Sequence, residues 1–182
     1  MDFKTVLEKL LTAFKEQNIR YALMGGFALG AMGVPRGTVD IDFLVNRDDM
    51  DRVDIIMQVL GYKCRYRSDN VSQYVSPLKI FGEVDFLHAF RSPSLTMLQR
   101  AEEKKMFNET LAVKVLRAED IIGFKVQAIA NDKSRRAVDL DDIESLIKHH
   151  KTALDWSLLE EYFALFGFNE MFSEFRRKYR GD

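Results

Sequence analysis

Two acidic residues, Asp40 and Asp42, are separated by one residue inside the apolar segment 39–45. Alternate side chains of a strand share a face, so both carboxylates are expected on one side and their apolar neighbours on the other. Like charges on one face repel and Asp is depleted in strands, so stability alone does not account for this pair. Paired carboxylates suit Mg²⁺ or Mn²⁺, and the pattern predicts a metal site. An edge strand with one face in water is the alternative interpretation.

A glycine pair, Gly25-Gly26, follows a short apolar run and precedes the start of an expected helix. Glycine lets the backbone approach a ligand closely, and N–H groups at a helix start favour phosphate. Arg36 and Thr38 alternate just ahead of Asp40. If the strand begins early, Thr38 shares the face of the aspartates, and Arg36 either meets a phosphate or holds Asp40 in place. An ordinary tight turn is the alternative for the glycines.

A third carboxylate is available in a later strand, predicted over residues 83–90. Glu83 and Asp85 alternate there with apolar residues, so they share one face, as in the earlier strand. Either acid would complete a site of three carboxylates, and a hairpin with one wet face is the alternative. His88 of the same strand is interpreted as a packing or supporting residue.

The elements that must hold these residues follow from hydrophobic periodicity. The pattern predicts an amphipathic helix up to about residue 18, helices after residues 46–48 and 92–93, and a helical C-terminal third. The helix that begins at residues 92–93 is expected to reach about residue 104. Strands are predicted over residues 19–24, 39–45, 62–66, 73–81, 83–90 and 111–116. This order predicts an α/β fold with a mixed β-sheet flanked by helices, comprising a core over residues 1–117 and a C-terminal helical part, 118–182, packed on it.

Composition narrows the classes of function. The 27 basic and 28 acidic residues give a net charge of −1, so no overall field favours nucleic acid or an anionic membrane. No apolar segment is long enough to span a membrane, and a cytoplasmic protein is expected. The single cysteine cannot form an internal disulfide, and it shows no zinc-ligand spacing with the three histidines.

Taken together, Gly25-Gly26, Arg36-x-Thr38-x-Asp40-x-Asp42 and the later Asp85 resemble the nucleotidyltransferase superfamily, the group related to DNA polymerase β. More narrowly, they are similar to the minimal nucleotidyltransferases and to toxin proteins of the AbiEii type. Lys125 and the run 136–146, RAVDLDDIESL, resemble the downstream helical segment of that family. The resemblance spans about residues 24–146.

The resemblance implies that Asp40, Asp42 and Asp85 are catalytic and hold two Mg²⁺ ions, with Asp85 preferred to Glu83 because the family acid precedes an apolar pair. It also implies nucleotide contacts from the glycine turn, from Arg36 and Thr38, and from Lys125. Asp139 is then a candidate on the acceptor side, with a solvated helix residue as its alternative. The candidate site residues are therefore Gly25, Gly26, Arg36, Thr38, Asp40, Asp42, Asp85, Lys125 and Asp139.

The predicted function is Mg²⁺-dependent transfer of a nucleoside monophosphate from a nucleoside triphosphate to a hydroxyl of RNA, protein or a small molecule. A toxin-type member that modifies transfer RNA or a protein, with an antitoxin partner, is one alternative. A nucleotide-sensing or protein-interaction module without turnover is another. A metal nuclease explains neither the glycine turn nor Lys125, and is disfavoured.

Overall fold

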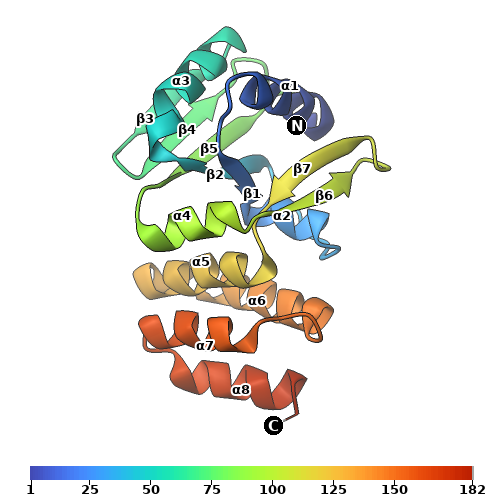
Figure 1. Cartoon of the computed structure of the whole chain (residues 1–182), viewed down its shortest axis with the longest axis vertical. Coiled ribbons are helices and arrows are strands. Elements are labelled where there is room, and N and C mark those ends of the chain that lie inside the picture. Colours follow the sequence, from blue (N-terminus) through green and yellow to red (C-terminus); the bar gives the residue numbers. More distant parts are fainter. Residues whose placement is uncertain (182) are drawn as a thin grey trace. The chain divides into compact units, whose positions relative to one another are not determined.

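A computed structural model describes residues 1–181, which divide into two compact units (Figure 1). The first unit comprises Met1–Ala31 and Pro35–Leu116. The second comprises Met32–Val34 and the chain from Arg117 onward. The sequence had placed the boundary between residues 117 and 118.

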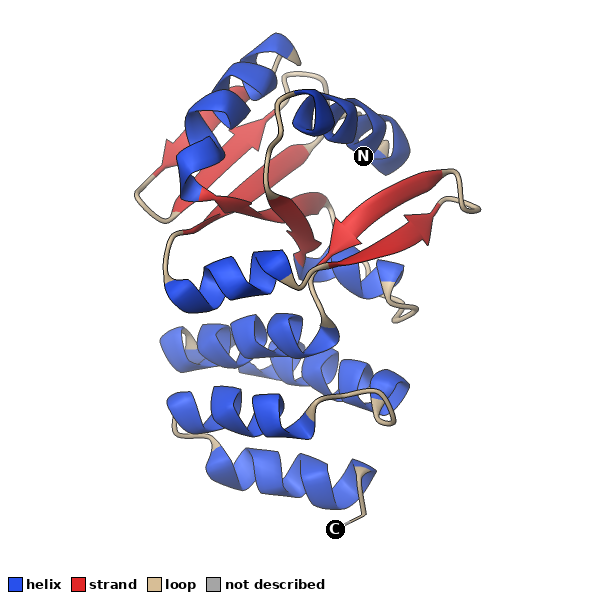
Figure 2. Ribbon diagram, in the orientation of Figure 1, coloured by secondary structure: helices blue, strands red, loops and turns tan. Residues whose placement is uncertain are grey.

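In the first unit, the described residues form a seven-stranded mixed sheet in the order β3-β4-β5-β2-β1-β7-β6 (Figures 1 and 2). Two strand pairs are parallel, the central pair β2–β5 and the pair β1–β7. The other pairs are antiparallel: β1–β2, β3–β4, β4–β5 and β6–β7. The strands are β1 (Tyr21–Met24), β2 (Asp40–Asn46), β3 (Lys63–Arg67), β4 (Val71–Val75), β5 (Glu83–Ala89), β6 (Glu102–Met106) and β7 (Leu111–Val115). The helices are α1 (Phe3–Glu16), α2 (Gly25–Ala31), α3 (Met50–Val59) and α4 (Ser92–Gln99), with a 3-10 turn at Arg47–Asp49. The predicted mixed sheet flanked by helices is confirmed.

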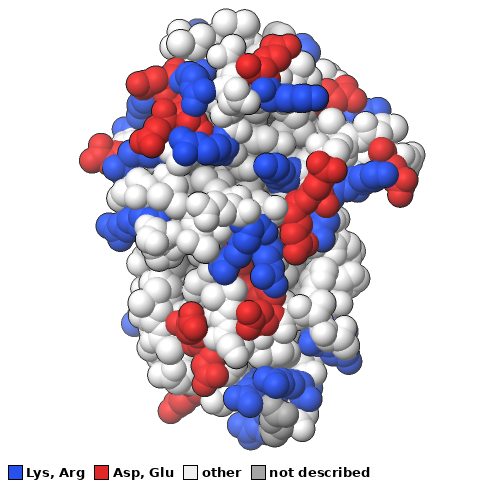
Figure 3. Space-filling model, in the orientation of Figure 1, with Lys and Arg blue, Asp and Glu red and all other residues white. Residues whose placement is uncertain are grey.

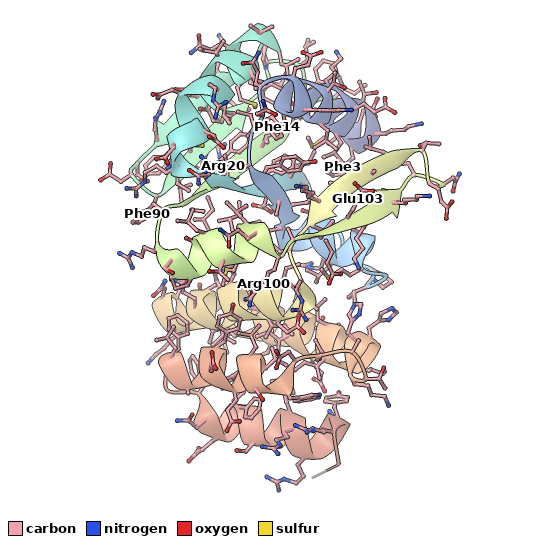
Figure 4. All side chains as sticks on the ribbon, viewed as in Figure 1. Phe3, Phe14, Arg20, Phe90, Arg100 and Glu103 are labelled. Atoms are coloured by element: carbon pink, nitrogen blue, oxygen red, sulfur yellow. The ribbon has the colours of Figure 1, made fainter. Side chains whose placement is uncertain are left out.

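One face of the central strands is apolar and is covered by α1. The helix repeats apolar residues at i, i+3 and i+4, which gives it one buried side, and Asp2 caps its start by accepting a bond from Thr5 N at 3.1 Å. Phe14 points from α1 toward the strands (Figure 4) and meets the rings of Phe43 and Phe86 at centroid distances of 5.5 and 6.3 Å. Because successive strand residues alternate, the carboxylates of β2 and β5 lie on the opposite face.

The second unit is helical. It contains α5 (Ala118–Asn131), α6 (Arg136–His150), α7 (Trp156–Leu165) and α8 (Asn169–Tyr179), with a 3-10 turn at Lys133–Arg135. The ring of Tyr162 lies over Gly123, where a Cβ atom would approach it to 2.9 Å, and its hydroxyl donates to Asp120 Oδ1 at 2.7 Å. These contacts fix α7 against α5.

Two predicted elements extend too far. The strand expected over residues 73–81 is Val71–Val75, and the chain turns over residues 77–81, beginning at Pro77, which has no backbone N–H to donate. The helix expected to continue to about residue 104 ends at Gln99, and Glu102–Met106 forms strand β6 instead. The run Glu-Glu-Lys-Lys favours helix locally, but antiparallel pairing with β7, including Lys104 opposite Val113, overrides that preference.

Acidic and basic side chains are interspersed on the face drawn in Figure 3, consistent with a net charge near zero. No helix in the described part of the chain is both long enough and apolar enough to cross a membrane.

Candidate active site

The carboxylates predicted from the sequence lie side by side on the first unit. In the parallel pair β2–β5, Asp40 is opposite Glu83 and Asp42 is opposite Asp85. The neighbouring antiparallel pairs place Met24 of β1 opposite Asp42 and Gln73 of β4 opposite Asp85. Directly opposed residues share a face, so one row of side chains crosses four adjacent strands with the acids at its centre.

The glycine turn lies directly against Asp42. Gly25 has a φ of 68°, and a Cβ atom on it would lie 1.9 Å from Asp42 Oδ2 and 2.6 Å from its Cγ. Only glycine fits this position, because both the backbone conformation and the carboxylate exclude a side chain. The turn and the acid therefore form one compact arrangement at the end of β1.

The loop ahead of β2 contacts the same turn. Thr38 Oγ1 donates to Asp40 Oδ1 at 2.6 Å, and a Cβ atom on Gly26 would lie 3.0 Å from that hydroxyl oxygen. The same Cβ would be 3.8 Å from Cγ of Arg36. Five predicted residues, namely Gly25, Gly26, Arg36, Thr38 and Asp40, are thus gathered around the β1–α2 turn.

Asp85 is held asymmetrically. Its Oδ2 accepts a hydrogen bond from Gln73 Nε2 at 2.8 Å, while its Oδ1 is buried and accepts none from the described residues. Burial raises the pKa of the Asp85 carboxyl above its ordinary value; the Gln73 amide lowers it, and the charges of Asp40 and Glu83 raise it further. A buried carboxylate oxygen without a donor is costly unless a positive ligand satisfies it.

Glu83, the competitor for the third position, is already engaged. Its two carboxylate oxygens meet both terminal nitrogens of Arg65, at 2.9 and 2.8 Å. A bidentate guanidinium satisfies a carboxylate in both charge and geometry. This contact favours Asp85 over Glu83 as the third acid.

The donor set fits a hard divalent cation, since it consists of carboxylate oxygens and includes the unsatisfied Oδ1 of Asp85. Within residues 1–181, no three His, Cys, Asp or Glu side chains are arranged to hold a metal ion unaided. Proteins usually bind Mg²⁺ through one or two carboxylates together with substrate phosphates and water, rather than in an all-protein cage. The residues present therefore fit a cation that is bound jointly by these carboxylates and by the phosphates of a nucleotide.

Lys125 and Asp139, predicted for nucleotide and acceptor, lie together in the second unit. Lys125 Nζ donates to Asp139 Oδ1 at 3.0 Å and to Asp142 Oδ2 at 2.6 Å, and Arg135 Nε reaches Asp139 Oδ2 at 3.1 Å. Asp139 is 1% exposed, so the alternative of a solvated helix residue is wrong for it. The ammonium group of Lys125 is balanced by two carboxylates.

His88 lies at the far end of β5 from the acids. Ser72 Oγ lies 3.0 Å from its Nε2, and the Asp69 carbonyl lies 3.0 Å from its Nδ1. Burial lowers the pKa of His88 below its ordinary value; the contact with the Asp69 carbonyl opposes this shift, and the positive charge of Arg47 adds to it. These contacts give His88 the packing role expected from the sequence.

Two residues of the site were not identified from the sequence, Gln73 and Arg65. Gln73 is the one amide in the alternating strand Val71–Val75, which was a visible signal. No pattern in the sequence marked Arg65, because it lies where the β3–β4 register shifts, between Cys64 and Tyr66. The pairing of either side chain with an acid depends on strand order.

Comparison with known proteins decides the family. The family described as "Uncharacterised nucleotidyltransferase" matches residues 3–177, nearly the whole chain. The protein belongs to this family. It is therefore an enzyme of the nucleotidyltransferase class, whose members transfer a nucleoside monophosphate. The resemblance read from the sequence is confirmed at this level.

Solved structures agree on the fold. The solution structure of the antibiotic-resistance factor ANT(2'')-Ia is 20% identical, with a TM-score of 0.65 and full coverage of both chains. Its crystal structure with adenylyl-2''-tobramycin is 17% identical, with a TM-score of 0.68, and covers 90% of this chain and 95% of that one. The lincomycin-bound lincosamide antibiotic adenylyltransferase LnuA is 14% identical, with a TM-score of 0.53 and coverage of 78% and 94%. No curated protein sequence matches this nucleotidyltransferase.

Proposed function

We propose that this nucleotidyltransferase moves a nucleoside monophosphate from a nucleoside triphosphate to a hydroxyl group, on the face that carries Asp40, Asp42 and Asp85. The acceptor oxygen bonds to the α-phosphorus, the bond between the α- and β-phosphates breaks, and pyrophosphate and the hydroxyl proton are released. The observation that supports this most is the β2–β5 register, which places Asp42 opposite Asp85 while Gly25 lies against the Asp42 carboxylate. A structural role alone explains neither the row of acids nor the buried Asp85 oxygen without a donor.

Each residue has a role that follows from its contacts. Asp40 and Asp42 would hold one Mg²⁺ or Mn²⁺ ion beside the triphosphate. Asp85 would help to hold a second ion on the acceptor side. When bound, such ions neutralise phosphate charge and lower the pKa of an acceptor hydroxyl. Thr38 fixes the Asp40 carboxylate by donating to it, which leaves the other carboxylate oxygen for a ligand.

The phosphate contacts would come from the glycine turn. Gly25 and Gly26 carry no side chain, so a phosphate can approach their backbone N–H groups closely. Arg36 lies beside Gly26 and supplies a positive charge on the same turn. The nucleotide contact of Lys125 stays a prediction from the sequence, since in the structure two aspartates balance its charge.

We infer a small molecule as the acceptor. The full-length similarity to an antibiotic-resistance factor, which was also solved with adenylyl-2''-tobramycin, supports this class, as does the similarity to a lincosamide antibiotic adenylyltransferase. Transfer RNA or a protein acceptor, and a toxin-type member with an antitoxin partner, are the competing proposals. All of these acceptors present a nucleophilic hydroxyl, so the same carboxylates would serve each of them.

The test incubates the protein with Mg²⁺ and each α-labelled nucleoside triphosphate, separately with aminoglycosides, lincosamides, bulk transfer RNA and the protein itself. Label is expected in a small-molecule product, and it should disappear in Asp40→Asn and Asp42→Asn, because each loses a charged ligand. Circular dichroism would verify that both variants fold.

Full activity in either variant would refute the carboxylate assignment. Label in transfer RNA or protein would refute the acceptor class and leave the chemistry standing. Nucleotide binding without transfer to any acceptor would instead indicate the sensing module.

A further inference from the structure

Gln73 is a polar residue that the proposed chemistry does not yet use. It lies at the centre of β4, directly opposite Asp85 in the antiparallel β4–β5 pair. The residues on either side, Ser72 and Tyr74, are buried on the apolar face, so the Gln73 side chain projects on the face of the acids. An amide here needs a partner because the position is half-buried.

The partner of Gln73 is the third carboxylate. The 2.8 Å bond from its Nε2 occupies Asp85 Oδ2 and no other atom of that carboxylate. An Asp side chain can rotate about its terminal bond, and a donor on one oxygen selects one orientation. In this orientation Oδ1 is buried and has no donor among the described residues. Oδ1 is therefore the Asp85 oxygen that Gln73 leaves without a hydrogen bond.

A second contact reinforces the selection. Arg65 holds both oxygens of Glu83, which lies two residues before Asp85 on the same face. Without a guanidinium, Glu83 would be a flexible carboxylate beside Asp40, its direct cross-strand neighbour. β4 therefore orients one acid while β3 engages the other.

From these contacts we propose that Gln73 is a positioning residue, whose amide holds Asp85 in the orientation that presents Oδ1 as a metal ligand. The inference rests on the proposed function, since it assigns Asp85 to a divalent cation. Gln73 itself touches neither metal nor substrate. Groups that hydrogen-bond to metal ligands in this way typically change metal affinity or activity by about 10- to 100-fold when removed.

The experiment measures Mn²⁺ binding, which requires no turnover. Free Mn²⁺ is followed by electron paramagnetic resonance during titration of the protein with a nonhydrolysable nucleoside triphosphate analogue present. Gln73→Met removes the donor at nearly constant volume, and Gln73→Asn keeps an amide that is too short to reach. Both are expected to weaken Mn²⁺ binding by about 10-fold or more. Should Gln73→Met fail to fold, Gln73→Asn provides the same comparison.

Two comparisons separate positioning from a general structural effect. Gln58→Met makes the same chemical change at an exposed site on α3 and should leave Mn²⁺ binding unchanged. In an Asp85→Asn background, Gln73→Met should cause no further loss, because the two residues act through one ligand.

Wild-type Mn²⁺ affinity in both folded Gln73 variants would overturn the inference, as would an equal loss with and without Asp85. Transfer that depends on Asp42 but not on Gln73 would overturn the inference about Gln73 and leave the proposed function standing. Mn²⁺ binding that depends on Gln73 and Asp85 in a protein without transfer activity would support the inference and refute the proposed function.

Discussion

Gly25→Ala tests the contact between the glycine turn and the acid. The new Cβ would lie 1.9 Å from Asp42 Oδ2, whereas real Cβ contacts are essentially never under 3.0 Å. The carboxylate must therefore retreat by about 1 Å, a displacement that can cost about 100-fold in rate when a catalytic group is involved. The φ of 68° adds about 1–2 kcal/mol of backbone strain in the folded state.

The expected result is a loss of about 100-fold in label transfer with a fall of about 2–8 °C in Tm, since 1 kcal/mol shifts Tm by about 2–4 °C at this chain length. Gly30→Ala is the matched control in the same helix, α2. A Cβ there meets nothing within 4 Å, so activity should be unchanged and stability should rise by about 0.5–1 kcal/mol. Gly25→Ala with wild-type kcat would refute the claim that the turn and Asp42 form one site.

Two further predictions concern buried charges. Lys125→Met should destabilise the second unit by about 3–5 kcal/mol in urea unfolding, because it leaves two buried carboxylates with less countercharge. Arg135→Ala, at a mostly exposed position, is the control and should cost under about 1 kcal/mol. Equal costs for the two variants would contradict this. Burial, with the charge of Arg47, holds the pKa of His88 below 6.5, so the stabilising neutral form is fully present above pH 6.5 and is lost as the pH falls. His88→Asn should flatten the decrease in Tm below pH 6.5, and an unchanged pH dependence would argue against that role.

The sequence was sufficient for the local part of the site. Alternation in a strand placed Asp40 and Asp42 on one face, and the glycine pair marked a turn at the end of β1. Both follow from neighbours a few residues apart, where backbone geometry is nearly determined. The same local rules failed for Glu102–Met106, because strand pairing outweighed helix propensity there.

The non-local part of the site could not be read from the sequence. Which acid lies opposite Asp42 depends on the order and register of β2, β5 and β4, and one residue of slip would turn Asp85 to the other face. The roles of Gln73 and Arg65 have the same origin. Each side chain gains its partner only through a neighbouring strand, and no motif connects them in the chain.

The parallel pairing of β2 with β5 also determines when the site can exist. Asp42 and Asp85 are far apart in the chain, so the loop between them must close before the acids meet, and non-local contacts of this kind form slowly. During synthesis, a chain released before β5 emerges carries the glycine turn and both early aspartates but no third acid. On the proposed function, truncated or partly folded molecules would be catalytically inert, and activity would report on a completed sheet.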